Sequence, residues 1–199
     1  MSFLKNCILF FGNLIFRRQE YLPWFKKNFA AFGDGSEIEH PSVISGYENI
    51  FIGGNTHILA NSRIQVYNNL TGNKAKVTIG DNCYLCFHLS ILAGGSISIG
   101  NDVLIASYVL ITSENHGMDP ENSIPYMNQP LVCKDVSIGD GCWIGEKVSI
   151  LQGVSIGKKC IIATNSVVTK SIPDYCIAAG IPARVIKKYD FEKHEWEKV

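Results

Sequence analysis

The 199-residue sequence has little charge, and neither sign of charge dominates. Charged residues make up 18% of the chain, and 18 basic side chains balance 18 acidic ones, which gives a formal net charge of +0. A neutral chain offers no overall electrostatic attraction for nucleic acid, so we expect no nucleic-acid partner. Low surface charge is typical of a protein whose surface is partly buried against another subunit.

Long hydrophobic runs are also absent, since a membrane span needs about 18 consecutive apolar residues. The most apolar stretch, from Cys7 to Phe16, contains Gly12 and Asn13 and is followed by Arg17. It has no small-residue cleavage site, so we do not expect a signal peptide.

Residues 1–32 are expected to form a helical segment, because Leu4, Ile8, Phe11 and Ile15 follow helical spacing. Two placements are open. The helix packs on the body of the protein or on a neighbouring subunit, or residues 1–30 make peripheral contact with a membrane surface.

The cysteines show no pairing pattern. Seven of them, an odd number, are spread through the chain, which favours a reducing compartment and a cytoplasmic protein. Cys83 and Cys86 form one CxxC without a second pair, a weak metal or redox signal. Cys142 and Cys160 are 18 residues apart, and we expect them to stack as small buried thiols.

What the sequence does have is a repeat of six residues. A step of six turns an α-helix by a net of about 240°, which would scatter the aliphatic side chains over several faces. A solenoid of short parallel strands, each directing one aliphatic side chain inward, fits the repeat instead. The residues in this register are Ile138, Ile144, Ile150, Ile156, Ile162 and Val168.

The repeat and its interruptions predict the domain organisation. The solenoid should occupy residues 33–170, with loops at 67–76 and 113–134 where Asn, Gly and Pro replace the repeat. Residues 171–199 are expected to form an extended exit and a short C-terminal helix. The longer loop contains His116, a side chain suited to taking a proton near neutral pH.

The chain resembles the left-handed β-helix acyltransferases of the hexapeptide-repeat family, which include bacterial galactoside, maltose, xenobiotic and capsule or O-antigen acetyltransferases. The resemblance implies an all-β, single-stranded left-handed parallel β-helix that forms a homotrimer with active sites between subunits. It also implies acetyl-CoA as co-substrate, a sugar or glycan acceptor and no required metal. The segments that carry it are 115–120, 141–145, 165–170 and 177–186.

The same resemblance assigns roles to residues. His116 matches the catalytic general base, and Glu114 or Asp119 could orient its ring. Cys86 stands where the sugar acetyltransferases have an acceptor-binding Asn, so the acceptor need not be a galactoside or maltose. His88 and Asn115 are further candidates for acceptor binding. The residues that match the CoA groove are Trp143, Gly145, Ala163, Thr164, Thr169, Lys170 and Arg184.

The sequence thus predicts an O-acetyltransferase that acts on a sugar hydroxyl, in a bacterial surface polysaccharide or its precursor. Alternatives are a xenobiotic (antibiotic) acetyltransferase and an N-acetyltransferase for a nucleotide-linked amino sugar. Outside the transferases, a zinc-dependent protein resembling γ-type carbonic anhydrase needs three converging histidines. The spacing of His40, His57, His88 and His116 lacks the paired pattern of that class. A purely structural solenoid is the last alternative.

Overall fold

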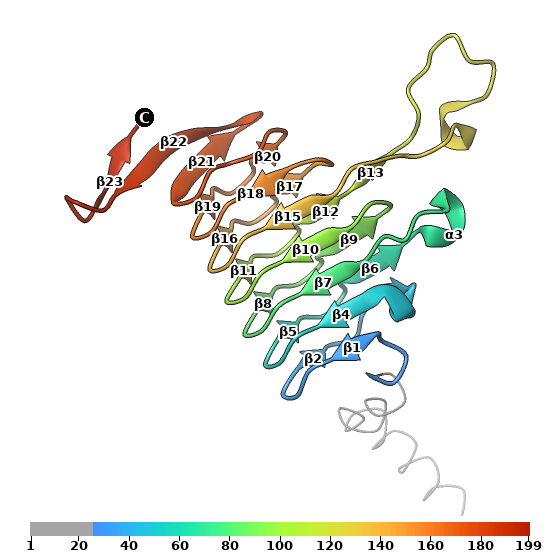
Figure 1. The fold of residues 1–199 in the computed structure, drawn as a ribbon, viewed down its shortest axis with the longest axis horizontal. Coiled ribbons are helices and arrows are strands. Elements are labelled where there is room, and N and C mark those ends of the chain that lie inside the picture. Colours follow the sequence, from blue (N-terminus) through green and yellow to red (C-terminus); the bar gives the residue numbers. More distant parts are fainter. Residues whose placement is uncertain (1–25) are drawn as a thin grey trace, which may run out of the picture.

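The computed structural model describes residues 26–199, which form a left-handed parallel β-helix (Figure 1). Each complete coil contributes one strand to each of three sheets. The first sheet contains β1 (Ala31–Phe32), β4 (Ile50–Ile52), β7 (Val77–Ile79), β10 (Ile97–Ile99), β15 (Val136–Ile138) and β18 (Ser155–Ile156). The second contains β2 (Glu37–Ile38), β5 (His57–Ile58), β8 (Tyr84–Leu85), β11 (Leu104–Ile105), β16 (Trp143–Ile144), β19 (Ile161–Ile162), β21 (Cys176–Gly180), β22 (Ala183–Asp190) and β23 (Glu195–Lys198). The third contains β3 (Val43–Ser45), β6 (Arg63–Val66), β9 (Ser90–Ala93), β12 (Leu110–Thr112), β17 (Ser149–Ile150) and β20 (Val167–Val168).

The core is a set of aliphatic columns that run up the inside of the coils. In the second sheet, Ile105 is paired with Ile144 and Ile144 with Ile162, and all three side chains are buried. Burying a side chain of this size stabilises the fold by roughly 1.5–3 kcal/mol relative to leaving it exposed. Cys142 and Cys160 are likewise stacked and buried, which confirms the prediction made from their spacing.

Polar side chains close the corner between the first and second sheets. The Asn101 Oδ1 accepts the Asp81 N–H at 2.8 Å, and the Asp140 Oδ1 accepts the Asn101 N–H at 2.7 Å. In each of these two coils, the residue after Asp81 or Asn101 has a left-handed backbone conformation. These residues are Asn82 and Asp102, both with φ 56°. Asn and Asp adopt that conformation more readily than other residues that have a Cβ atom, which is why they recur at this position.

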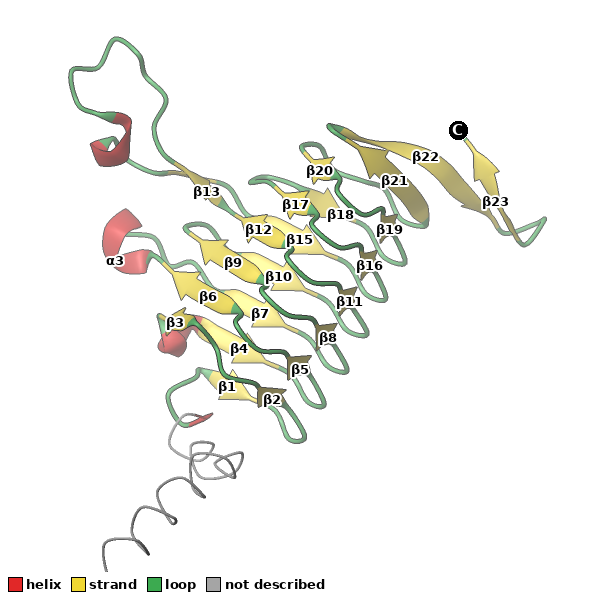
Figure 2. Ribbon diagram, turned by 180° about the vertical axis from the view of Figure 1, so that it is seen from behind, coloured by secondary structure: helices red, strands yellow, loops and turns green. Residues whose placement is uncertain are grey.

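Two segments leave the coils on the side where the third sheet ends, at the positions predicted as loops (Figure 2). The shorter one contains the four-residue helix α3 (Asn68–Thr71). The preceding coil has a single helical turn, η1 (Tyr47–Asn49), at the equivalent place after its third strand. The longer one begins and ends as an antiparallel pair, β13 (Glu114–Asn115) with β14 (Val132–Cys133), and contains the turn η2 (Tyr126–Asn128).

The expected C-terminal helix is wrong, because the last residues form an antiparallel arm on the second sheet. β22 pairs with β21 and then with β23, which ends at Lys198. The Asp190 carboxylate accepts the N–H groups of Glu192 and Lys193 and thereby closes the turn. Tyr189 lies opposite Trp196 with ring centroids 5.3 Å apart, a cross-strand aromatic contact that favours the hairpin.

The predicted N-terminal helical segment falls almost entirely on residues 1–25, which lie outside the described residues. The coil already begins at β1, whose Phe32 ring packs edge-on against Phe29 at 5.2 Å. Within residues 26–199, every helix is too short to cross a membrane.

Candidate active site

His116 lies where a strand pair leaves the β-helix. β12 ends at Thr112, and in the next strand Asn115 pairs with Val132 of β14. His116 follows directly and its side chain is exposed. Figure 1 shows the loop extending away from the coils above α3. An exposed imidazole at the base of such a loop can take a proton from a ligand held by an adjoining surface.

Gln129 fixes the shape of this loop from its inside. The side chain is 5% exposed, and its Nε2 donates to the carbonyl oxygens of Asp119 at 2.9 Å and Ile124 at 3.1 Å. Its Oε1 accepts the Asp119 N–H at 3.1 Å. A Cβ atom at Gly117 would lie 2.8 Å from the Gln129 side chain, so glycine is required for this packing. Sequence analysis did not identify Gln129, because its partners lie on loop backbone that follows no repeat.

The two carboxylates proposed to orient His116 have other neighbours in the described chain. The Asp119 Oδ1 accepts the N–H of Glu121 at 3.0 Å. Glu114 pairs with Cys133 at the neck of the loop. The orienting role of either carboxylate therefore stays a prediction.

The neck of the loop is tightly packed against the coil below. A Cβ atom at Gly94 would come within 2.7 Å of the Glu114 Cβ and 2.8 Å of the Cys133 Sγ. Burial, with a further contribution from Glu114, raises the pKa of the Tyr67 hydroxyl. The Asn73 Nδ2 donates to the Gly94 carbonyl oxygen at 2.9 Å, which ties the segment that contains α3 to the coil below the neck.

The acceptor-binding candidates Cys86 and His88 lie at the corner between the second and third sheets. Cys86 is half-buried, and burial raises the pKa of its thiol. The His88 ring stacks on Tyr108 of the next coil, with centroids 4.6 Å apart and planes at 7°. Tyr108 was not predicted as a site residue. The strand pairing places its coil between the coil of Cys86 and the coil of Gly145.

The CoA candidates Gly145, Ala163 and Thr164 lie at the same corner, farther along the stack. Gly145 donates its N–H to Ile162 at 2.8 Å, and a Cβ atom on it would lie 2.6 Å from the Thr164 backbone nitrogen. Glycine therefore lets the two coils approach closely, and the half-buried Ala163 and exposed Thr164 form the adjoining surface. An extended ligand arm can lie against such a surface.

The remaining CoA candidates lie on different sides of the last coils. Trp143 is 51% exposed and lies on the outer face of the second sheet. Thr169 and Lys170 are exposed after β20, at the corner between the third and first sheets. Arg184 is exposed on β22, opposite Ala179 of the second sheet. Each cation could meet a phosphate group. Glu146, also exposed, follows Gly145 and places a carboxylate beside this surface.

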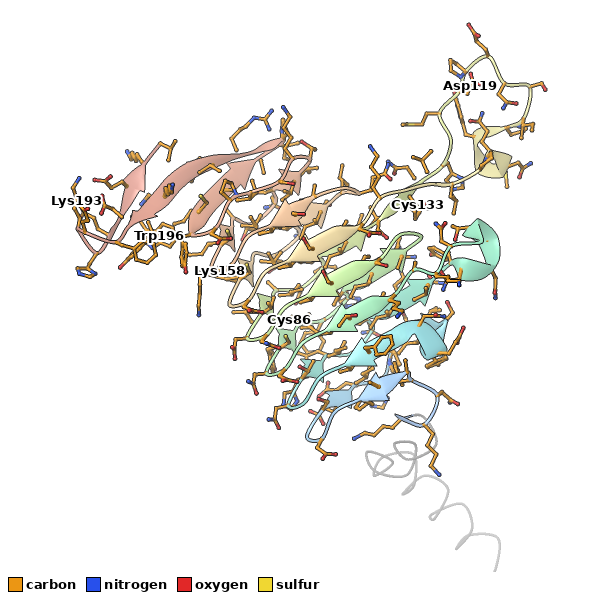
Figure 3. All side chains as sticks on the ribbon, in the orientation of Figure 1. Cys86, Asp119, Cys133, Lys158, Lys193 and Trp196 are labelled. Carbon is orange, nitrogen blue, oxygen red and sulfur yellow. The ribbon has the colours of Figure 1, made fainter. Side chains whose placement is uncertain are left out.

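One chain does not bring these groups together. Figure 3 shows Cys86 on the coils and Asp119 at the far part of the protruding loop. Asn115 and His116 belong to the loop, whereas His88 and the CoA candidates belong to the coils. In residues 26–199, three or more His, Cys, Asp or Glu side chains do not gather in a metal-binding arrangement.

The fold and the repeat define the architecture of the chain, a left-handed β-helix built from six-residue repeats. Residues 135–170 match the family model described as bacterial transferase hexapeptide (six repeats). The resemblance to hexapeptide-repeat acyltransferases inferred from the sequence is thereby confirmed.

Individual acyltransferases share the coil region. The chain is 41% identical over 128 residues to WbbJ of Escherichia coli K12, provisionally named a lipopolysaccharide biosynthesis O-acetyl transferase, covering 61% of this chain and 65% of WbbJ. It is 37% identical over 125 residues to galactoside O-acetyltransferase of the same organism. That match covers 62% of this chain and 60% of the galactoside O-acetyltransferase. The chain thus spans somewhat under two thirds of these curated relatives. The structure of a point mutant of the N-acyltransferase AntD from Bacillus cereus, in complex with dTDP-4-amino-4,6-dideoxyglucose and coenzyme A, shares the fold. Its TM-score is 0.70 at 23% identity, over 85% of this chain and 89% of AntD.

Proposed function

We propose that this chain is an acetyl-CoA-dependent O-acetyltransferase that acetylates a sugar hydroxyl in a bacterial surface polysaccharide or its precursor. The observation that carries the proposal is the exposed His116 on a loop whose shape is fixed by the buried Gln129. The similarity to WbbJ and to galactoside O-acetyltransferase supports an oxygen acceptor. The coenzyme A in the AntD complex supports an acyl-CoA donor.

In the proposed reaction His116 acts as general base. A neutral imidazole nitrogen takes the proton of the acceptor hydroxyl as its oxygen attacks the thioester carbonyl carbon. The tetrahedral intermediate then breaks its C–S bond, which yields the acetyl ester, and the imidazolium returns its proton to the CoA sulfur. Such base catalysis contributes typically 10²–10⁴-fold, and holding both reactants in one site adds to it.

The separation of the two residue sets within one chain supports a site shared by two subunits. In the proposed homotrimer, the loop that carries His116 reaches the corner of a neighbouring chain, where Cys86, His88 and Gly145 lie. Lys170, after β20, and Arg184, on the C-terminal arm, would hold the CoA phosphates. Peripheral membrane contact through residues 1–30 at the inner face of the membrane is a further part of the proposal, motivated by the apolar sequence there.

A transfer to an amino sugar is the second candidate, because AntD shares the fold and was crystallised with an amino-dideoxyglucose nucleotide. The acceptor then supplies an amine that must lose a proton, a step for which the same imidazole would serve. Acceptors in matched pairs, such as galactose and galactosamine, distinguish the two candidates by the ester or amide that is formed.

The test compares two His→Asn variants. His116→Asn should lower CoA release from acetyl-CoA in the presence of sugar acceptors by at least about 100-fold. His194→Asn is the matched control, since His194 is exposed in the turn of the C-terminal arm and should leave the rate unchanged. Equal rates for both variants, or a purified protein that neither binds CoA nor releases it, would contradict the proposal. A monomer in sedimentation analysis would contradict the shared site.

A further inference from the structure

The outer face of the second sheet carries one continuous row of large side chains. Strand pairing places these residues directly above one another, one per coil, because the neighbouring residue of each strand points into the core. From the CoA end to the first coil, the row is Trp143, Leu104, Tyr84, His57 and Glu37.

The row changes character along its length. Trp143, Leu104 and Tyr84 are 51%, 41% and 46% exposed, so the upper part is an open apolar surface. Below Tyr84 the row becomes polar: the His57 Nδ1 lies 3.1 Å from the Glu37 Oε1, and both side chains are about 40% exposed. The His57 ring lies 6.1 Å from the Tyr84 ring.

This pattern is not a general property of the coil exterior. From the height of Tyr84 upward, the outer positions of the first sheet are small and polar: Thr78, Ser98, Ser137 and Ser155. At the height of His57 the first sheet carries Phe51, a ring without a polar partner like the Glu37–His57 pair directly above or below it in the row. A half-exposed hydrogen bond between a carboxylate and an imidazole contributes about 1 kcal/mol or less to stability, so folding alone gives little reason for the Glu37–His57 contact.

The geometry points to a second acceptor subsite formed by Tyr84, His57 and Glu37, which takes the sugar unit next to the one that is acetylated. The inference rests on the proposed function. Tyr84 is two residues from Cys86, so a sugar acetylated near Cys86 lies beside the upper end of this row. From Tyr84 to Glu37 is two coil steps, about 10 Å, which is within the reach of an adjoining sugar.

The chemistry of the three side chains defines the ligand class. An aromatic ring flanked by an imidazole and a carboxylate offers an apolar face and hydrogen-bond acceptors, which suits a pyranose with free hydroxyl groups. The Glu37 carboxylate disfavours a uronic acid at this place by charge repulsion. The acceptor is therefore inferred to be a neutral di- or oligosaccharide unit rather than a monosaccharide.

The experiment measures kcat/KM for CoA release with matched acceptors: galactose and lactose, glucose and maltose, and N-acetylglucosamine and chitobiose. The unmodified protein should prefer the disaccharide in at least one pair. In Glu37→Gln and His57→Ala, the ratio of disaccharide to monosaccharide kcat/KM should fall about tenfold, or about 1.4 kcal/mol. Thr78→Ala, on the outer face of the first sheet, is the control and should keep the ratio.

A second measurement does not depend on turnover. Saturation-transfer NMR with the same disaccharides and CoA should show contact with both sugar rings in the unmodified protein, and with one ring in His57→Ala. An unchanged ratio in both variants, or no disaccharide preference in the unmodified protein, would overturn the inference. If CoA is still released with sugar acceptors in that case, the proposed function stands. Loss of all CoA release and CoA binding would refute the proposed function itself.

Discussion

The Gln129 side chain binds the backbone of Asp119 at both its N–H and its C=O, as a paired strand would. This bidentate contact spans ten residues and crosses the interior of the loop that carries His116. The geometry of the candidate catalytic base therefore depends on a side chain that is remote from it in sequence.

Replacing Gln129 with Ala should loosen the loop without unfolding the coils. The change removes three hydrogen bonds, each worth about 1 kcal/mol net, and leaves backbone groups of the loop without their partner. We expect amide hydrogen exchange to accelerate in residues 117–125 and CoA release to fall at least about tenfold, with little change in melting temperature. Met127→Ala is the control, because Met127 is 76% exposed in the same loop. Equal exchange rates in both variants would show that Gln129 does not hold the loop.

The neck of the loop gives a prediction for alkaline pH. Burial and then Glu114 raise the pKa of the Tyr67 hydroxyl. The folded state therefore keeps the Tyr67 proton more strongly than the unfolded state. The contribution to stability is complete below the unfolded pKa of about 10 and is lost as pH rises through the folded pKa. We expect Tyr67→Phe to weaken the fall in stability above about pH 10 in denaturant titrations.

Glu114→Gln tests the electrostatic part of the same contact. Without the carboxylate, Tyr67 should ionise at lower pH, which a spectrophotometric titration near the tyrosinate band detects as a shifted step. The titration of the Tyr67→Phe variant identifies that step by its loss. An identical titration in the Glu114→Gln variant would mean that the two side chains are not electrostatically coupled.

The buried cysteines predict a fixed order of chemical modification. Cys83 donates its S–H to Gly100 at 3.1 Å, and burial raises the pKa of its thiol. Contact with Cys160, together with burial, raises the pKa of the Cys142 thiol. The hydrogen bond with Cys142 lowers the pKa of the Cys160 thiol to about 7, but this side chain is 0% exposed, so access and not the thiolate fraction decides its reactivity. Among the cysteines of residues 26–199, iodoacetamide at neutral pH should therefore label the half-buried Cys86 and Cys133 first. Peptide mapping should find Cys83, Cys142 and Cys160 labelled only after denaturation. Equal native labelling at Cys142 would contradict the closed core.

The sequence allowed the coils to be predicted because one physical rule repeats in every strand. The inward isoleucines Ile138, Ile144 and Ile150 keep a constant step, and each is buried. The C-terminal arm could not be predicted in this way. Its turn depends on the Asp190 carboxylate, and its pairing depends on Tyr189 meeting Trp196, a contact that only the register reveals.

The candidate site divides along the same line. The place of Gly145, a candidate cofactor position, follows from the register of the coils, so its position on the coil was predictable. The roles of Gln129 and Tyr108 could not be predicted from the sequence. Gln129 binds loop backbone that follows no repeat, and Tyr108 contacts His88 through a ring stack that the sequence does not show.

Gly145 provides the sharpest test of the CoA surface. A Cβ atom there would lie 2.6 Å from the Thr164 nitrogen and 2.7 Å from the Ile162 oxygen, so Gly145→Ala must push two coils apart. Overpacking of this kind costs about 1–3 kcal/mol. We expect a lower melting temperature and weaker CoA binding by calorimetry. Gly54→Ala is the matched control, because the nearest atom to its Cβ, the Asp34 oxygen, is 3.3 Å away. That distance is a tight contact and not an overlap, so Gly54→Ala should destabilise the fold less than Gly145→Ala does. If Gly145→Ala keeps its CoA affinity although it is less stable, the pantetheine arm does not lie at this corner, and the groove must be sought on another face of the coils.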